Sequence, residues 1–222
     1  MSLEQSIREE LQNPLPGIEY HRRMMALHNP SLNTFSEKNI QAAVALIIYS
    51  PQKNYNEIVL IKRTSYDGHH SDQVSFPGGK FDGIDSTLVQ TAIRETYEEI
   101  GINLKESEFL GTLTPIHIHV SGFDVTPFVF FYHNMINPKV NNEEVSYLIR
   151  CSLTSLFDKS IIKTTYLNLN GYEIEAPYFD IKNEIVWGAT SMILAEFIEI
   201  LRRIEKKDPD LLESGFTKND CL

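Results

Sequence analysis

Cysteine, tryptophan and positive charge are all scarce in this 222-residue chain. There are two cysteines, Cys151 and Cys221, and a single tryptophan. One cysteine is expected in a strand and the other in the tail, so we expect no disulfide framework and a reducing compartment. Lys and Arg number 20 against 30 Asp and Glu, which gives a formal net charge of −10. Without a basic surplus to replace counterions, neither nucleic acid nor an anionic membrane surface is expected as a partner.

A long apolar run is also missing at the N-terminus. The first eleven residues, MSLEQSIREEL, carry charges within their first turns, which argues against a signal peptide or a membrane-spanning helix. Cytoplasm is therefore the expected location. The length and a hydrophobic content of 42% suit one globular domain with a sizeable core. The acidic balance still permits a phosphorylated small molecule as substrate, because a bound metal ion can supply positive charge locally.

Hydrophobic periodicity predicts an alternation of strands and helices. A short N-terminal helix over residues 2–12 is followed by a mostly irregular segment, residues 14–39, that prolines interrupt. That segment is either an arm that wraps the domain or a border of the substrate site or of a homodimer. The remaining expected elements are strands over Ile40–Ser50, Glu57–Arg63, Glu108–Pro115 and Phe123–Tyr132, a hairpin of Ile161–Leu169 with Tyr172–Ile174, and a helix over Gly188–Lys206.

The stretch from Phe76 to Ile102 predicts a glycine-rich loop that leads into one helix. Its helix should begin near Ser86, with Asp85 or Ser86 as the N-cap, and end near Ile100. Gly101 then suits the left-handed conformation that ends a helix. One apolar sector of the helix should pack on a sheet, and it comprises Leu88, Val89, Ala92, Ile93, Thr96 and Ile100.

Three carboxylates share one edge of this helix. Glu95 and Glu99 are one turn apart, and Glu98 lies about 60° to their other side. Like charges at this spacing repel one another, so the cluster is either a solvated acidic face or a cation site. Oxygen-only ligands suit Mg²⁺ or Mn²⁺ rather than zinc. A free carbonyl of the preceding Gly78-Gly79 loop can join such a site, and Arg94 can bind the carboxylates through a bidentate pair.

This stretch resembles the Nudix box, G-x5-E-x7-R-E-U-x-E-E-x-G-U, in which U is a bulky apolar residue. Three positions depart from the box: Asp85 replaces its first Glu, eight residues rather than seven separate Asp85 from Arg94, and Thr96 takes the first U position. The first two departures are typical of the coenzyme A pyrophosphatase-like branch, whose box reads FPGGK-x-D-x-x-D and then TA-x-RE-x-x-EEIG. The residues that match the general box are Gly79, Arg94, Glu95, Glu98, Glu99, Gly101 and Ile102.

The resemblance implies an α/β fold, the Nudix α/β/α sandwich with a mixed β-sheet. The branch also begins with a PLPG-x-x-x-H segment, matched here from Pro14 to His21. Residues 1–39 are accordingly assigned to the same domain as an N-terminal helix and wrapping arm, residues 40–206 to the Nudix hydrolase domain, and residues 207–222 to a polar tail.

A second signature of the branch, L-L-T-x-R-[SA]-x3-R-x3-G-x3-FPGG, is matched only in part. Leu60, Arg63 and the FPGG run fit, whereas Gly68 stands in place of the second Arg and Asp72 in place of the Gly. The first change removes a positive charge and the second adds a negative one, where a 3′-phosphate would be held. His69 and His70 either take over as donors or are loop-tip residues. The residues assigned to substrate binding are Arg63, His69, His70 and Lys80. Arg63 is either a contact to a phosphate or adenine group or only a surface residue.

Two further groups remain open on the sequence. In many Nudix enzymes a late-loop Glu or Asp completes the metal set or acts as base, and Glu144, or Glu143, is the candidate here. The alternative is that both are solvated. His117 and His119 share one face of a strand, which is more typical of alternation in an exposed strand than of a metal site.

The function implied by the resemblance is Mg²⁺- or Mn²⁺-dependent hydrolysis of a nucleoside diphosphate derivative. The metal ligands would be Glu95 and Glu99, with Glu98 as a further ligand or base and the Gly79 carbonyl as another, and Arg94 would be a structural clamp. Coenzyme A or a derivative is the first substrate, cleaved to 3′,5′-ADP and 4′-phosphopantetheine. ADP-ribose or a similar nucleotide is the alternative. A nucleotide-sensing module without turnover is disfavoured, because the box carboxylates and Arg94 are all present.

Overall fold

The computed structural model describes residues 1–26, 39–52, 55–64, 72–169 and 172–213. Most of its strands form one mixed sheet of eight strands, and three later strands form a separate antiparallel sheet. The strands of the main sheet are β1 (Ile40–Gln52), β2 (Tyr55–Arg63), β3 (Val74–Ser75), β4 (Gly78–Lys80), β5 (Phe109–Thr112), β6 (Ile116–Ile118), β7 (Phe123–Tyr132) and β8 (Val145–Ser152). The strands of the second sheet are β9 (Ile162–Leu169), β10 (Tyr172–Ile181) and β11 (Glu184–Val186).

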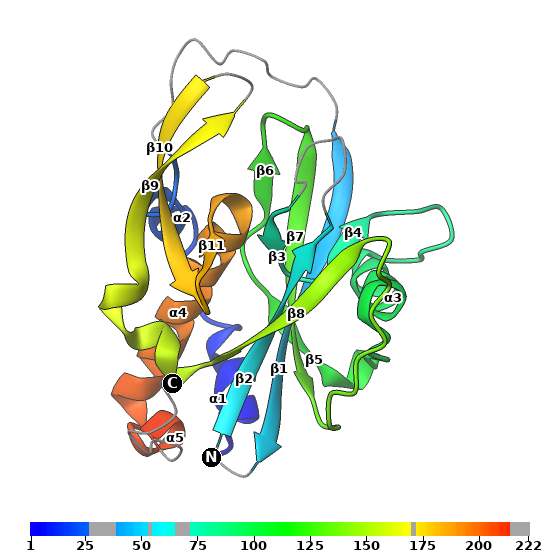
Figure 1. Ribbon diagram of the computed structural model, residues 1–222. Helices are drawn as coiled ribbons and strands as arrows, with labels where there is room; N and C mark the ends of the chain where they lie inside the picture. The colour runs from blue at the N-terminus through cyan, green and yellow to red at the C-terminus, as the bar shows by residue number, and fades with distance from the viewer. Residues whose placement is uncertain (27–38, 53–54, 65–71, 170–171, 214–222) are drawn as a thin grey trace.

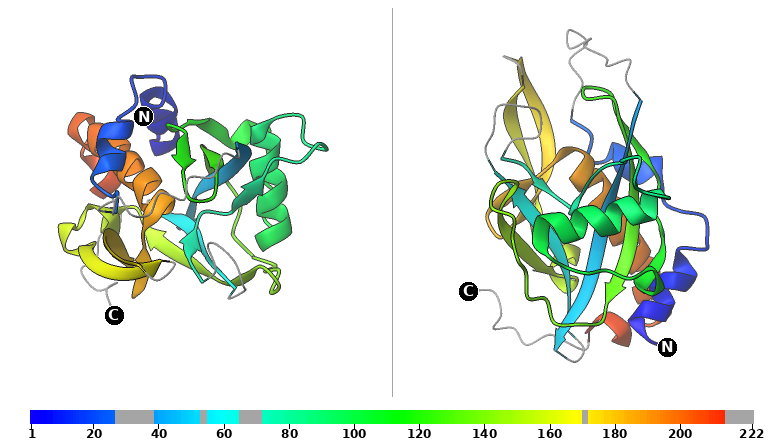
Figure 2. Two further views of the ribbon diagram at one scale, coloured as in Figure 1. Left: turned by 90° about the horizontal axis from the view of Figure 1, so that it is seen from above. Right: turned by 90° about the vertical axis from the view of Figure 1, so that its right-hand side faces the viewer.

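Helices cover both faces of the main sheet, as the sandwich fold predicts. Figures 1 and 2 show α3 on one side and α1, α2 and α4 on the other. The α-helices are α1 (Leu3–Glu10), α2 (Ile18–Arg22), α3 (Leu88–Ile100), α4 (Gly188–Lys207) and α5 (Asp210–Glu213). Short 3-10 turns are η1 (Glu106–Glu108), η2 (Thr154–Phe157) and η3 (Lys159–Ile161). None of the helices in the described ranges is long and apolar enough to cross a membrane.

Strand β1 is the centre of the fold because its apolar run is buried on both faces. It pairs in parallel with β7, from Ile40 opposite Phe123 to Tyr49 opposite Tyr132, and antiparallel with β2 and β4. Alternate residues point to opposite faces of a strand. Leu46 and Ile48 accordingly enter the core under α1 and α4, whereas Ala45 and Ile47 enter the core under α3.

The expected elements are present, with two differences. Helix α2 forms within the segment predicted to be mostly irregular. The hairpin of β9 and β10 belongs to its own sheet, in which β11 pairs with the second half of β10.

The described part of the N-terminal arm is tied to α4 by one buried carboxylate. Glu196 is fully buried and accepts the Gly17 backbone N–H at 3.1 Å. Nε2 of His21 lies 2.8 Å from Oε2 of the same carboxylate. The Thr114 hydroxyl donates to Oε1 at 2.7 Å. Glu196 thereby joins the arm, α4 and the connection between β5 and β6. The division into arm, domain and tail remains a prediction.

We predict that His21→Ala destabilises the protein by about 3–5 kcal/mol, because it leaves the Glu196 carboxylate buried beside an unfilled space. Glu19→Ala in the same helix is the matched control. Glu19 forms an exposed pair with Arg23, so its loss should change the free energy of unfolding by less than about 1 kcal/mol. Urea unfolding at neutral pH measures both. Equal effects of the two substitutions would contradict the role given to the buried contact.

Candidate active site

The glycine-rich loop enters the main sheet before the helix begins. Gly79 in β4 pairs with Ala43 of β1, and the chain then turns towards α3. The N-cap of α3 is Thr87, whose hydroxyl accepts the Gln90 N–H at 3.2 Å, so the prediction of Asp85 or Ser86 as the cap is wrong. Gly101 ends the helix with φ 70°, as predicted.

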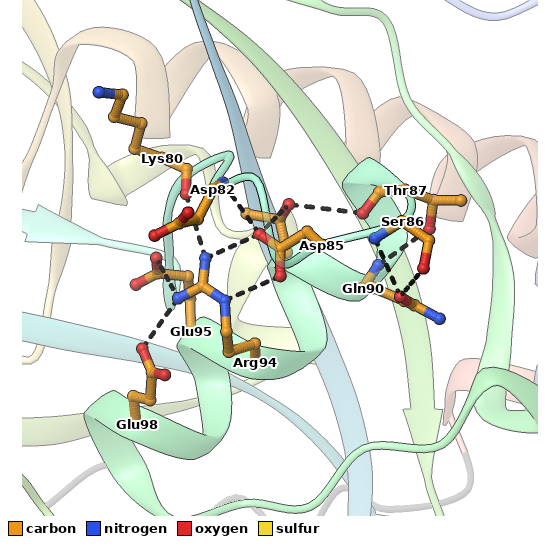
Figure 3. Close-up of polar contacts among 10 residues, drawn as sticks. Lys80, Asp82, Asp85, Ser86, Thr87, Gln90, Arg94, Glu95 and Glu98 are labelled. Atoms are coloured by element: carbon orange, nitrogen blue, oxygen red, sulfur yellow. Dashed lines mark hydrogen bonds and ion pairs between the residues drawn. The ribbon is translucent and has the colours of Figure 1, made fainter.

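Asp85 is instead the partner of Arg94 (Figure 3). Nε of Arg94 donates to Oδ1 of Asp85 at 2.8 Å, and Nη2 donates to Oδ2 at 2.9 Å. This planar two-bond pair is the geometry that guanidinium and carboxylate favour. Hydrogen bonds from Arg94 lower the pKa of Asp85 to about 2 and outweigh burial, which acts to raise it. The sequence contained a signal for this pair, because Asp85 stands at the first acidic position of the box.

The third nitrogen of Arg94 joins two carboxylates of the helix. Nη1 donates to Glu95 at 2.8 Å and to Glu98 at 2.9 Å, and Nη2 also reaches the Lys80 carbonyl at 3.2 Å. The bidentate clamp proposed for Arg94 thus falls on Asp85, while Glu95 and Glu98 share a single nitrogen. Figure 3 shows all these carboxylates converging on the one guanidinium.

Glu95 lies against the backbone of the loop because residue 79 has no side chain. A Cβ at Gly79 would lie 2.5 Å from the Glu95 carboxylate. Burial, only partly offset by Arg94, raises the pKa of Glu95, and the charges of Glu98 and Glu144 raise it further. The carboxylate therefore sits where negative charge is costly and a cation would be favourable.

Glu99 is the most deeply buried member of the cluster, with 1% of its side chain exposed. Its Oε2 accepts the Gly78 N–H at 2.8 Å, and its Oε1 accepts from Nη1 of Arg63 at 3.1 Å. Burial raises the pKa of Glu99 to about 7, although the Gly78 N–H and Arg63 act in the opposite direction. Arg63 thus lies at the end of β2 facing the box helix, in contact with a carboxylate.

The late loop brings Glu144 to the same end of α3. Backbone N–H groups of Lys139 and Asn141 donate to the carbonyls of Ile100 and Glu99, each at 2.9 Å. The Glu144 carbonyl in turn accepts from the Thr64 N–H at 3.0 Å. Glu144 is exposed, and its charge contributes to raising the pKa of both Glu95 and Glu99. Glu143 is also exposed and contacts Thr64 through its backbone carbonyl.

Among the other residues assigned to substrate binding, Lys80 is exposed at the end of β4, and His69 and His70 lie outside the described residues, as does Gly68. Asp72 adopts φ 57°, a left-handed conformation that glycine favours and that Asp tolerates better than most residues. Its carboxylate lies 3.2 Å from Nζ of Lys62, which also bonds Glu184 at 3.0 Å. The pairing with Lys62, which the sequence analysis missed, offsets the negative charge that Asp72 introduces.

The His117 and His119 pair is separate from the carboxylate cluster. Their ring centroids are 4.6 Å apart, and Nδ1 of His117 lies 2.6 Å from Asp124 on the neighbouring strand. Within the described ranges, no three His, Cys, Asp or Glu side chains are arranged so that they could hold a metal ion as they stand. At the box helix, Arg94 and Arg63 contact the carboxylates that a metal ion would need.

The donor set nevertheless fits a divalent cation. Its side chains offer oxygen atoms alone, which suits Mg²⁺ or Mn²⁺. Burial, together with the charges of neighbouring carboxylates, raises the pKa of Glu95 and of Glu99, and a bound cation would lower both. The residues that would hold it are Glu95 and Glu99, with Glu98 and the Gly79 carbonyl beside them.

A glycine loop feeding a carboxylate-bearing helix, within an α/β/α sandwich, defines a class of metal-dependent phosphoanhydride hydrolases. The sequence pattern of the NUDIX domain family matches residues 39–160. This chain belongs to the Nudix hydrolase family, whose members act on small nucleotide substrates with divalent metal ions.

Relatives agree with this assignment. An uncharacterized Nudix hydrolase NudL of Yersinia enterocolitica is 32% identical over 169 residues, covering 76% of this chain and 85% of the relative. NudL of Yersinia pestis is 33% identical over 161 residues, covering 72% and 79%. A MutT/nudix family protein of Enterococcus faecalis has a TM-score of 0.53 at 14% identity, covering 96% of this chain and 79% of that one, which supports the fold alone.

Alanine at three glycines should separate catalysis from stability. The Cβ of Gly79→Ala would overlap the carboxylate of Glu95, which lies at the end of a flexible side chain and can shift. We therefore expect turnover to fall roughly 10²-fold with folding retained. Gly78→Ala places its Cβ 2.2 Å from the Ala43 carbonyl at φ 149°, so it should destabilise by roughly 2–6 kcal/mol. Gly83→Ala meets no atom within 4 Å and is the control. Thermal unfolding and turnover measure all three, and full activity of Gly79→Ala would contradict the placement of Glu95.

The pair of Asp85 and Arg94 predicts a pH dependence of stability. The pKa of Asp85 is lowered from 3.8 to about 2, so its contribution is fully present above about pH 4 and is lost as pH falls towards 2. Asp85→Asn should therefore destabilise by about 1–3 kcal/mol at pH 7, and the difference from the unsubstituted protein should shrink below pH 4. Urea unfolding from pH 7 to pH 3 measures this. A difference that grows in acid would contradict the pairing.

Proposed function

We propose that this Nudix hydrolase is a Mg²⁺- or Mn²⁺-dependent diphosphatase that cleaves coenzyme A or its derivatives to 3′,5′-ADP and 4′-phosphopantetheine. The observation that carries the substrate class is the backbone at Asp72. The second signature of the coenzyme A branch has glycine here, and Asp72 keeps the left-handed conformation that glycine suits. Pairing with Lys62 also offsets the charge that the replacement adds. These two features of Asp72 support the resemblance to the branch at this position.

Each residue of the site has a proposed part in the reaction. A divalent cation, when bound, neutralises the diphosphate oxygens and lowers the pKa of a water molecule. Glu95 and Glu99 hold that cation, and Glu98 is a further ligand or the base that accepts the proton of the attacking water. Glu144, exposed beside them, is the alternative base. Arg94 orients Glu95 and Glu98 from its anchor on Asp85.

Substrate contacts are proposed for side chains around the same end of α3. Arg63 reaches the cluster from β2, and its planar guanidinium suits a phosphate. Lys80 follows the two glycines of the loop and is exposed there. His69 and His70 remain predicted contacts to a 3′-phosphate. We further propose that the protein acts in the cytoplasm; homodimerisation through the arm remains a hypothesis.

Product analysis tests the substrate. The purified protein is incubated with Mg²⁺ or Mn²⁺ and one candidate substrate at a time: coenzyme A, ADP-ribose, NADH or a diadenosine polyphosphate. The products are separated and identified by mass spectrometry. We expect 3′,5′-ADP from coenzyme A at a rate well above the others. Turnover of ADP-ribose with none of coenzyme A would contradict the proposal and would assign the pocket to another nucleoside diphosphate derivative, in line with the charge lost at Gly68.

The residue assignment is tested in the same assay. Glu99→Gln keeps the side-chain size and an acceptor for Gly78, so the fold should persist while turnover falls by roughly three orders of magnitude on every substrate. Glu9→Gln, which neutralises an exposed carboxylate on α1, is the control and should retain full turnover. Normal hydrolysis by the Glu99 variant would place the metal site elsewhere.

A further inference from the structure

Two arginines divide the carboxylates of the site between them, and they are held differently. Arg94 donates from all three guanidinium nitrogens, to carboxylates and to a backbone carbonyl. Arg63 reaches the site through Glu99, with Nη1 3.1 Å from Oε1. Its Nε is buried and has no hydrogen-bond partner among the described residues. Arg94 is therefore held by hydrogen bonds at every guanidinium nitrogen. Arg63 has a buried donor without a partner in the described part of the chain, which is energetically costly and favours a change of partner.

Glu99 itself is fixed. Its side chain is 1% exposed, and its Oε2 accepts the Gly78 N–H at 2.8 Å. Its Oε1 is the oxygen that Arg63 occupies. A cation that binds Glu99 through Oε1 therefore approaches the oxygen that the guanidinium already contacts. Since both carry positive charge, they repel strongly at a separation of a few Å.

We propose that Arg63 holds Glu99 only in the metal-free protein, that a divalent cation displaces it, and that the released guanidinium then binds the diphosphate of the substrate. Displacement follows from competition for Oε1, and capture follows from the planar fork, which suits two phosphate oxygens. The capture step rests on the proposed function, because it takes the substrate's diphosphate as the anion. The displacement step depends only on the metal.

The exchange makes metal binding precede substrate binding. Before the metal arrives, Arg63 supplies the positive charge that the buried Glu99 requires. Once it has moved, its charge adds to that of the metal on the side of the site from which β2 approaches. A diphosphate can then bind the metal ion and the guanidinium of Arg63 together. In the metal-free protein the same guanidinium bonds the Glu99 carboxylate instead. Metal and substrate should consequently bind with positive coupling.

Metal affinity without substrate tests the displacement. Mn²⁺ binding is measured by titration calorimetry on the full chain, for the unsubstituted protein, Arg63→Ala and Arg63→Gln. We expect both variants to bind Mn²⁺ about tenfold more tightly, because the competitor is gone. Lys159→Ala is the charge control, since it removes the same charge from an exposed side chain of η3, which has no part in the site, and should change the affinity less than about threefold.

Two results would overturn the displacement. One is unchanged or weaker Mn²⁺ binding by both Arg63 variants, and the other is an equal gain in Lys159→Ala, which would indicate a general effect of charge. Arg63→Gln retains most of the side-chain volume if Arg63→Ala does not fold, and thermal unfolding in chelator monitors folding of each.

Methylenediphosphonate, which cannot be hydrolysed at its P–C–P bridge, tests the capture. At saturating Mn²⁺ the Arg63 variants should bind it about tenfold more weakly than the unsubstituted protein, and in chelator the proteins should not differ. Equal affinity of all proteins at saturating Mn²⁺ would overturn the capture step. Neither titration uses coenzyme A, so failure of the substrate assignment in product analysis would leave both results standing.

Discussion

The burial of like charges at one end of α3 is the constraint on which the rest of the site depends. Glu99 has 1% of its side chain exposed, and burial raises its pKa to about 7. Its negative charge therefore needs positively charged or hydrogen-bonding groups nearby to stabilise it. Arg63 and the Gly78 N–H stabilise Glu99 through hydrogen bonds, and Arg94 forms ion pairs with Glu95 and Glu98. Two arginines and a backbone N–H thus supply the positive charge that the proposed cation would otherwise provide.

Contacts on both faces of the main sheet support this end of the helix. Strand β1 is buried on both faces, and β4 pairs with it. This pairing places Gly78 and Gly79 against the carboxylates of α3. On the opposite face, the Thr190 hydroxyl of α4 donates to the Val74 carbonyl of β3 at 3.1 Å. Glu196 fastens the N-terminal arm to the same helix. Packing far from the carboxylates therefore supports the loop that contacts them.

Local sequence patterns predicted the sheet strands and the box helix, because hydrophobic periodicity and Gly101 act within a few residues. The same local rules failed at the N-cap, where Thr87 caps the helix and Asp85 is taken by Arg94. They also missed the separate sheet of β9 to β11, since strand length says nothing about which strands pair. Contacts such as Arg63 with Glu99 join residues 36 apart in the chain, and only the folded backbone brings them together.

The position of the metal ion is the central claim, and anomalous diffraction from crystals grown with Mn²⁺ tests it most directly. The account predicts a strong anomalous peak between β4 and α3, bound by oxygens of Glu95 and Glu99 at about 2.0–2.3 Å, the range typical of small divalent cations with oxygen ligands. Arg63 should then no longer contact Glu99. A peak only elsewhere, for example beside His117 and Asp124, with the arginine contacts of the box helix intact, would contradict the account.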